Sequence, residues 1–220
     1  AMVAASVNYP IRGAVTWKSI VGTNVASDAL SNLASPGVLG GALIIVGEDY
    51  GEGASVIQER THAFALKSSL WLIDPRPDLP TLVRAVEKGF ELSEASNTPV
   101  ILELRIRACH MFGSFVARDN VAARFSAKDR LAPARFNYDR LSHPPATFRQ
   151  EIDKVGRRLP AAQRFIVDNQ LNERLGPADA DIGIIVQGGL FNVLNGRLAL
   201  AGLSDVDAAV ALPTLVLNVV

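Results

Sequence analysis

The sequence predicts an α/β protein with a doubly wound, mostly parallel sheet. Short apolar runs, of the kind that parallel sheets bury on both faces, recur along the first hundred residues. Stretches with helical periodicity separate these runs, so strands and helices alternate along the chain. Crossovers between parallel strands are right-handed, and ligands in such folds bind in the crevice outside the carboxyl ends of the strands.

Four strands are expected in the amino-terminal half, at residues 13–16, 42–46, 70–74 and 99–105. The clearest helix lies between the last two strands, with Pro77 and Pro80 near its start and Asn97 after its end. Its apolar face is expected to carry Leu79, Leu82, Val83, Val86 and Phe90. Residues 1–9 resemble the tail of a helix whose preceding strand is absent.

The character of the chain changes between residues 113 and 178. Apolar density falls, prolines cluster, and twelve Lys and Arg residues stand against seven Asp and Glu residues. This excess could contact phosphates, but it is more typical of a solvated linker that packs on a neighbouring acidic surface. Two helices are expected here, at 148–159 and 161–175, the second started by Pro160 and stopped by Gly176-Pro177.

A new strand at 181–187, the Gly188-Gly189 pair, a helix at 190–201 and a strand at 215–220 open a second α/β unit. The predicted organisation is therefore a first domain at 1–112, a basic helical linker at 113–178, and the start of a second domain at 179–220. The chain ends inside an apolar strand, so we expect an excerpt of a longer polypeptide that lacks the amino-terminal part of its first domain.

Composition excludes several classes of function. Lys and Arg equal Asp and Glu at 22 each, which gives no electrostatic basis for binding nucleic acid. The single cysteine, Cys109, excludes an internal disulfide and a Cys-ligated iron–sulfur cluster held by this chain alone. The longest apolar run, 208–220, is broken by Pro213 and is too short to span a membrane. With no targeting leader, a cytoplasmic protein is expected.

The loop after the first strand carries the groups that a ligand crevice needs. It supplies a cation in Lys18, close backbone approach at Gly22, and capping side chains in Thr23 and Asn24. Asn24 is expected to cap the helix that follows by accepting from its first N–H groups. The alternative is an ordinary, well-capped connection between a strand and a helix.

The loop after the second strand, residues 47–53, is acidic and rich in glycine. It is poorly suited to phosphate, which prefers bare N–H groups and cations, and better suited to a ligand with N–H donors or positive charge. The alternative is a solvated acidic turn. The Gln58-Glu59-Arg60 segment is expected within the first turns of the next helix, with its side chains facing the same crevice as Lys18 and Asn24.

These residues resemble a known family. The resemblance is carried by Lys18-x-x-x-Gly22-x-Asn24-Val25-Ala26, Gly40-Gly41-Ala42-Leu43-Ile44-Ile45-Val46-x-x-Asp49, Gln58-Glu59-Arg60, Phe90-Glu91-Leu92-Ser93-Glu94 and Pro99-Val100-Ile101-Leu102, and extends to about Arg107. Their order and spacing are similar to those of thiamine-pyrophosphate-dependent 2-oxoacid:ferredoxin oxidoreductases, in particular the α-subunit type of indolepyruvate:ferredoxin oxidoreductase. The part resembled is the pyrimidine-binding domain.

The resemblance implies an enzyme that oxidatively decarboxylates 2-oxoacids, with aryl pyruvates as substrates. Thiamine pyrophosphate would be the cofactor, coenzyme A the acyl acceptor, and ferredoxin the electron acceptor, reached through iron–sulfur clusters. Lys18, Gly22, Asn24 and Asp49 would line the cofactor pocket. The Gln58-Glu59-Arg60 segment would face the substrate, and an Arg guanidinium matches a carboxylate in bidentate geometry. A salt bridge from Arg60 to Glu59 or to an acid at the sheet edge is an equal alternative.

Two parts of such a site are missing from this sequence. The glutamate that activates the cofactor would lie upstream of Ala1, so the catalytic residue is unknown. No Gly-Asp-Gly motif for Mg²⁺ and diphosphate occurs, so metal and clusters would be bound by other parts of the full protein. Glu48 and Glu52 do not match the position of the missing glutamate. We therefore expect these residues alone to be inactive, and the intact enzyme to be at least a dimer.

Other candidates have ordinary explanations. His62 could contact a substrate but is more typical of a surface or half-buried histidine, and Cys109-His110 lacks further metal ligands at suitable spacing. Trp17 and Tyr50 could wall an aromatic ligand, or simply pack. Two other classes of function remain open: a thiamine-dependent transferase or non-oxidative decarboxylase, and a non-catalytic α/β module for ligand binding or assembly.

Overall fold

A parallel four-stranded sheet forms the centre of the molecule. The computed structural model describes residues 2–49, 57–122, 132–133, 137–204 and 211–220. The strands are β1 (Gly13–Lys18), β2 (Ala42–Glu48), β3 (Trp71–Ile73) and β4 (Val100–Arg105), in the order β1-β2-β4-β3. All three pairings are parallel, with Gly13 opposite Ala42, Ile44 opposite Ile101, and Trp71 opposite Val100. The predicted strands are confirmed within a few residues.

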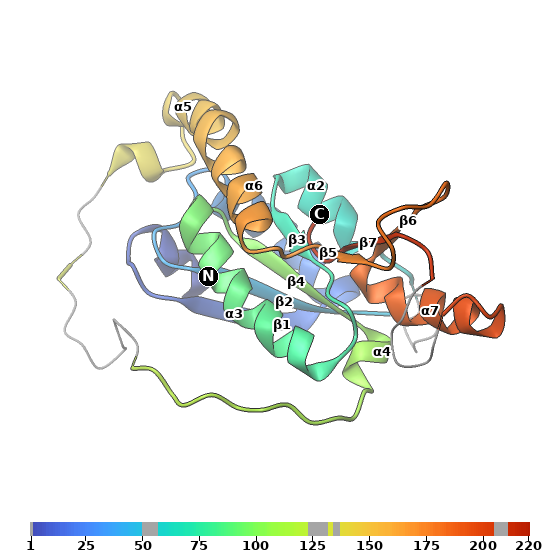
Figure 1. The fold of residues 1–220 in the computed structure, drawn as a ribbon. Coiled ribbons are helices and arrows are strands. Elements are labelled where there is room, and N and C mark those ends of the chain that lie inside the picture. Colours follow the sequence, from blue (N-terminus) through green and yellow to red (C-terminus); the bar gives the residue numbers. More distant parts are fainter. Residues whose placement is uncertain (1, 50–56, 123–131, 134–136, 205–210) are drawn as a thin grey trace.

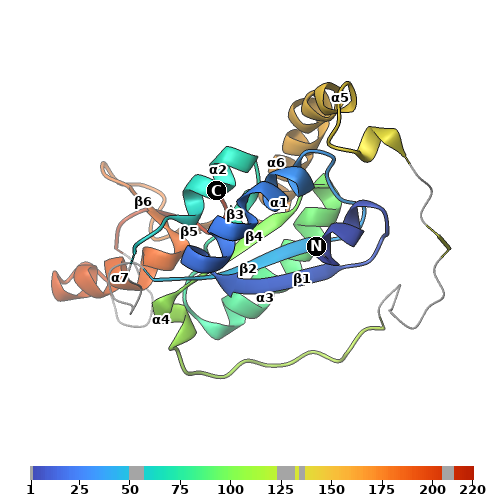
Figure 2. The ribbon, with the colours of Figure 1, turned by 180° about the vertical axis from the view of Figure 1, so that it is seen from behind.

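Helices cover both faces of this sheet. In Figure 1, α3 (Leu79–Ser96) and α6 (Leu159–Asp168) lie over one face, and Figure 2 shows α1 (Asn24–Ala34) and α2 (Thr61–Ser68) over the other. Alternate residues of the central strands pack into two separate cores, one on each face of the sheet. Leu43 and Leu102 face α3, whereas Ile44 and Ile101 face α1 and α2. Burial on both faces explains why the strands are apolar throughout. The predicted doubly wound α/β fold is confirmed.

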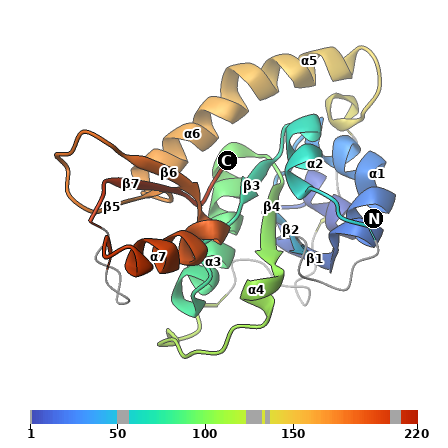
Figure 3. The same cartoon turned by 90° about the vertical axis from the view of Figure 1, so that its right-hand side faces the viewer.

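A second, smaller sheet follows near the end of the chain. It contains β5 (Glu173–Leu175), β6 (Ile184–Gln187) and β7 (Thr214–Leu217) in the order β5-β7-β6, with α7 (Phe191–Leu200) beside it (Figure 3). The last residues return to the first sheet, because Leu72 and Val220 exchange two backbone hydrogen bonds of 2.9 Å. The edge of β3 is therefore paired rather than exposed.

The helices of the linker differ from the expectation. After α4 (Ile106–Cys109) and a short 3-10 helix (Tyr138–Arg140), α5 (Ala146–Asp153), a π-helical turn (Lys154–Arg158) and α6 form one continuous rod (Figure 3). The prediction of two separate helices divided at Pro160 was wrong. The wider π turn lies directly before Pro160, where the ring would otherwise clash with the preceding turn.

The rod also ends earlier than predicted, at Asp168 rather than residue 175. Asn169 closes it by donating from its side chain to the Phe165 carbonyl at 3.0 Å, and Gln170 then adopts a φ of 49°. Leu171 turns into the core, and β5 follows at Glu173. Residues 2–7 form a 3-10 helix rather than the end of an α-helix.

One buried arginine holds the rod against the first domain. Arg158 is 1% exposed and donates to the carbonyls of Ala34 at 2.9 Å and Ser35 at 2.7 Å, at the carboxyl end of α1. A longer bond of 3.5 Å reaches the Asn97 carbonyl, at the carboxyl end of α3. Helix carboxyl ends carry partial negative charge. This arginine of the basic segment thus binds backbone carbonyls, and its Nε lies 3.3 Å from Asp153 of the same rod.

Candidate functional site

The strands that lead into the two glycine-containing loops end side by side at the carboxyl edge of the sheet. Strands β1 and β2 are neighbours, and Lys18 pairs with Gly47 at the ends of both. The first two strands are therefore neighbours, as a crevice shared by their loops requires. An ion pair joins the two loops, with Lys18 Nζ 2.9 Å from Asp49 Oδ2. The Asp49 side chain is 16% exposed, so this pair is shielded from solvent on one side.

Asn24 does not cap α1 as predicted. A π-helical turn (Ser19–Thr23) runs directly into the helix, so Asn24 is already its first residue and has helical backbone angles. Its amide Nδ2 instead donates to Glu59 Oε1 at 2.5 Å and to the Ile20 carbonyl at 3.1 Å. The prediction assumed that the helix begins at Asn24 from an extended residue. The side chain links the first loop to the segment before α2.

Gly22 is needed for packing. A Cβ at this position would lie 2.3 Å from Cγ of Trp17, so any side chain would displace the indole. Trp17 Nε1 in turn donates to Thr23 Oγ1 at 3.0 Å. Contact with Trp17 accounts for the glycine here, and Trp17 is fixed against the turn that follows β1.

The Gln58-Glu59-Arg60 segment precedes α2 rather than forming its first turns, which corrects the prediction. Arg60 has extended backbone angles, and α2 begins at Thr61. The Arg60 guanidinium donates to the Glu59 carbonyl oxygen at 3.0 Å, while the Glu59 carboxylate is held by Asn24. Gln58 and Arg60 are both exposed. The segment therefore lies beside the first loop, as expected, although not in a helix.

A buried carboxylate at the end of β2 fixes the start of α2. Glu48 is 2% exposed, and its two oxygens accept from the Thr61 backbone N–H at 3.2 and 3.0 Å. The Thr61 hydroxyl lies 3.0 Å from that of Ser19. A negative charge at a helix amino terminus is stabilising. Glu48 thus has a structural partner at the start of α2.

A cleft of about 640 Å³ lies at the ends of β1, β2 and β4. Its lining combines Lys18, Asp49 and Trp17 with Cys109 and His110, which follow β4. Burial, and then the negative charge of Asp49, raise the pKa of the Cys109 thiol, so it is protonated at neutral pH. No group of three metal-ligating side chains occurs among the described residues. Tyr50, Glu52 and Gly53 lie outside the described part of the chain.

A second polar cluster lies beside β4. Arg105 binds Asp74 in bidentate fashion, at 3.1 Å and 2.6 Å, and also donates to Gln187 Oε1 at 3.2 Å. Gln187 Nε2 lies 2.7 Å from His62 Nε2, and His62 Nδ1 lies 3.5 Å from the buried carboxylate of Glu103. Burial lowers the pKa of His62, which favours the neutral ring. His62 is thus a half-buried residue that joins α2 to the second sheet.

Comparison with known proteins identifies the relatives of this chain. No family model matches it. It is 28% identical over 189 residues to the indolepyruvate oxidoreductase subunit IorA of Methanothermobacter marburgensis, covering 86% of this chain and 30% of that protein. The subunit of the same name from Pyrococcus abyssi is 26% identical over 203 residues, covering 92% and 31%. This chain is a homologue of part of IorA. The family resemblance in the sequence is confirmed.

A solved structure supports the fold. The 2-oxoglutarate:ferredoxin oxidoreductase from Magnetococcus marinus aligns with a TM-score of 0.57 and 14% identity, covering 98% of this chain and 43% of that one. The chain spans about a third of the length of its IorA relatives. Among the described residues, none of the helices combines the length and apolar character needed to cross a membrane.

Proposed function

We propose that this chain is the pyrimidine-binding part of a thiamine-pyrophosphate-dependent 2-oxoacid:ferredoxin oxidoreductase. The observation that carries the proposal is the match to IorA over 86% of the chain. In this proposal residues 1–112 form the pyrimidine-binding domain, 113–178 a linker, and 179–220 the start of the next domain. Aryl pyruvates are the proposed substrates, coenzyme A the acyl acceptor, and ferredoxin the electron acceptor.

The cleft suits an aminopyrimidine ring in size and chemistry. Its volume of about 640 Å³ is in the range of small-molecule sites, which is about 300–1,000 Å³. The Asp49 carboxylate offers an acceptor for amino N–H groups, Lys18 a donor, and Ile45 and Leu104 an apolar wall. Lys18, Asp49 and the neighbouring Asn24 would hold the ring. When bound, the cofactor supplies the nucleophilic carbon and the electron sink that decarboxylation of a 2-oxoacid needs.

The residues of this chain would bind and orient the reactants. Arg60, on the exposed segment beside the cleft, is the proposed partner of the substrate carboxylate, with Gln58 and Glu59 beside it. The Asn24–Glu59 hydrogen bond fixes this segment against the first loop, so it would set the position of Arg60. The activating glutamate, the Mg²⁺ ligands and the iron–sulfur clusters are assigned to other parts of the full protein. A cytoplasmic homo-oligomer completes the proposal.

The test is anaerobic turnover by the full-length protein. With thiamine pyrophosphate, Mg²⁺, indolepyruvate and coenzyme A, reduction of a viologen dye is expected, whereas residues 1–220 alone should give none. Release of carbon dioxide without dye reduction would instead identify a non-oxidative decarboxylase or transferase. Lys18→Gln should weaken cofactor binding, measured by quenching of tryptophan fluorescence, and Lys67→Gln on α2 is the matched control. A strict monomer with full activity would contradict the proposed assembly.

A further inference from the structure

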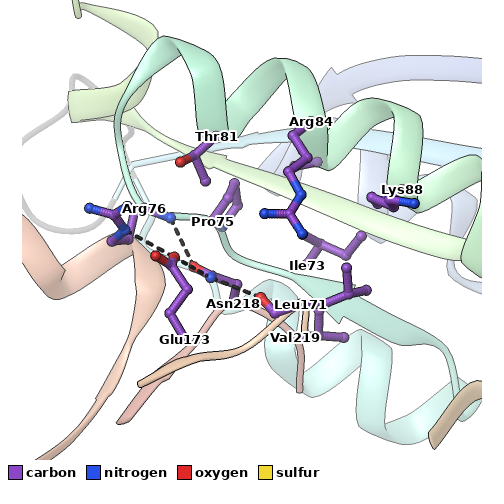
Figure 4. A pocket seen from close by; sticks show the side chains of 11 residues that line it. Ile73, Pro75, Arg76, Thr81, Arg84, Lys88, Leu171, Glu173, Asn218 and Val219 are labelled. Carbon is purple, nitrogen blue, oxygen red and sulfur yellow. Dashed lines mark hydrogen bonds and ion pairs between the residues drawn. The ribbon is translucent and has the colours of Figure 1, made fainter. Parts of the chain in front are cut away.

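A separate hollow lies at the opposite edge of the sheet from β1, where the first sheet meets the second. It has a volume of about 120 Å³ (Figure 4). Its walls come from α3, from the segment after β3, from the start of β5 and from the residues after β7. Both units of the molecule therefore contribute to it, and none of its lining residues belongs to the Lys18–Asp49 cleft.

The inner lining of this hollow is apolar. Ile73, Ala85, Leu171 and Val219 line it, and each is at most 9% exposed. These side chains belong to the larger of the two cores of the first sheet. Apolar surface of this kind favours an apolar group over water.

The rim carries three cations and one acid. One of the cations, Arg76, forms an ion pair with the acid, Glu173, so these two charges neutralise each other. Arg76 Nε lies 3.0 Å from Glu173 Oε1, and the Arg76 guanidinium rests 5.1 Å above the ring of Phe191. Glu173 Oε1 also accepts from Asn218 Nδ2 at 2.8 Å. Figure 4 shows these three polar residues joined along one wall.

The other two cations, on α3, rest mainly on a neutral residue. Arg84 and Lys88 are four residues apart on α3, a spacing at which like charges destabilise a helix. Both rest on oxygens of neutral Asn169, Arg84 on its carbonyl and Lys88 on its side chain, each at 3.1 Å. Lys88 also pairs with Glu91 at 2.6 Å, but that carboxylate is 41% exposed and such surface pairs are weak.

In the described part of the chain, no carboxylate forms an ion pair with Arg84 within 4 Å. Figure 4 shows its guanidinium reaching from α3 over the apolar lining. A guanidinium presents five donors, of which the Asn169 carbonyl accepts one. The remaining donors can hold a carboxylate at the mouth of the hollow.

We propose that this hollow binds a small carboxylic acid with a short apolar tail. The carboxylate would lie on Arg84, with Lys88 beside it, and the tail would pack against Ile73, Leu171 and Val219. The volume holds several water molecules, and it is well below the roughly 300 Å³ at which sites for drug-sized ligands begin. Because the walls come from both units, the bound acid fastens the second sheet to α3.

The test uses the full-length protein and isovalerate as the probe, with isovaleramide and inorganic phosphate for comparison. Isovalerate should raise Tm saturably, with a dissociation constant on the order of 1–10 mM for so small a ligand. Arg84→Gln should weaken this binding about tenfold or more, as loss of a charged hydrogen bond does. Lys67→Gln, which removes a cation from α2, and Arg60→Ala, at the proposed active site, should leave it unchanged.

Each alternative outcome overturns the proposal. Equal stabilisation by isovaleramide would show that no anion is recognised, and equal stabilisation by phosphate would show that the apolar lining has no part. Unchanged binding in Arg84→Gln would place the acid elsewhere. Arg84 also supports the end of α6, so its replacement can change Tm by itself. The Tm of Arg84→Gln with isovalerate is therefore compared with the Tm of the same variant without it. Ala85→Val, which narrows the hollow and keeps every charge, should weaken isovalerate as well, and full binding in it would also reject the site.

Discussion

Replacing Arg158 by methionine tests the account of how the helical rod is held. Methionine keeps an apolar stem of similar length but removes the two short bonds to Ala34 and Ser35, at 2.9 and 2.7 Å. Hydrogen bonds to charged groups contribute about 1.5–3 kcal/mol each, so the loss should be about 3–5 kcal/mol after some repacking. The neighbouring acid, Asp153, is 39% exposed and is not left as a buried charge.

Thermal unfolding followed by circular dichroism measures this loss. For a chain of this size 1 kcal/mol shifts Tm by about 2–4 °C, so Arg158→Met should lower Tm by about 6–20 °C. Arg157→Met is the matched control, because Arg157 is 55% exposed and loses only surface contacts: an i, i+4 pair with Asp153, an arrangement that contributes about 0.3–0.5 kcal/mol, and an exposed hydrogen bond to Asn97 Oδ1. Equal Tm values for the two variants would refute the reasoning, since buried capping of α1 would then contribute nothing beyond a surface pair.

Three further predictions concern the two polar regions. Arg60→Ala should raise KM for the oxoacid about tenfold or more in steady-state assays of the full-length enzyme, as loss of a charged hydrogen bond predicts; an unchanged KM would discard the substrate role. His62 has a lowered pKa in the folded state, mainly through burial, so its contribution to stability should be complete above about pH 6.5 and should fall as the pH drops further. His62→Gln should flatten that dependence in denaturant titrations, and an unaltered slope would contradict it. Gly189→Ala should cost about 1–3 kcal/mol by overpacking, because its Cβ would lie 2.2 Å from Asp74 Oδ1 and 2.3 Å from Arg105 Nε; wild-type stability would reject this.

The sheet could be predicted from the sequence because parallel strands buried on both faces leave a strong local signal. Runs such as 42–46 and 99–102 are apolar at every position, and helices with one apolar face separate them. The order β1-β2-β4-β3 is not encoded locally, since the neighbours of β4 are set by long-range packing. The short strand β5 was missed because only three residues pair, and its sequence continues a helical pattern.

The candidate site could be predicted at the level of loops but not of individual side-chain roles. Lys18 and Asp49 come from two strand ends that any parallel pairing of β1 and β2 brings together. The role of Asn24 depended on one detail, the π-helical turn before α1, which turns an expected cap into a link to Glu59. Propensity rules do not resolve a single widened turn. A π-helical turn and an α-helical turn differ in their backbone hydrogen bonds, but similar residues form both.

A charged residue inside an apolar strand was the signal available for the second polar cluster. Glu103 follows three fully buried residues of β4, and a carboxylate in that position needs partners from other elements. Those partners are His62 of α2 and, two residues along β4 itself, Arg105, and both also contact Gln187 of the second sheet. Sequence alone does not reveal this convergence, since Gln187 lies more than eighty residues away from either partner. The same contacts tie the second unit to the sheet edge that carries the candidate cleft. Displacement of the second unit would therefore disturb the packing around α2 and around the Arg60 segment that precedes α2.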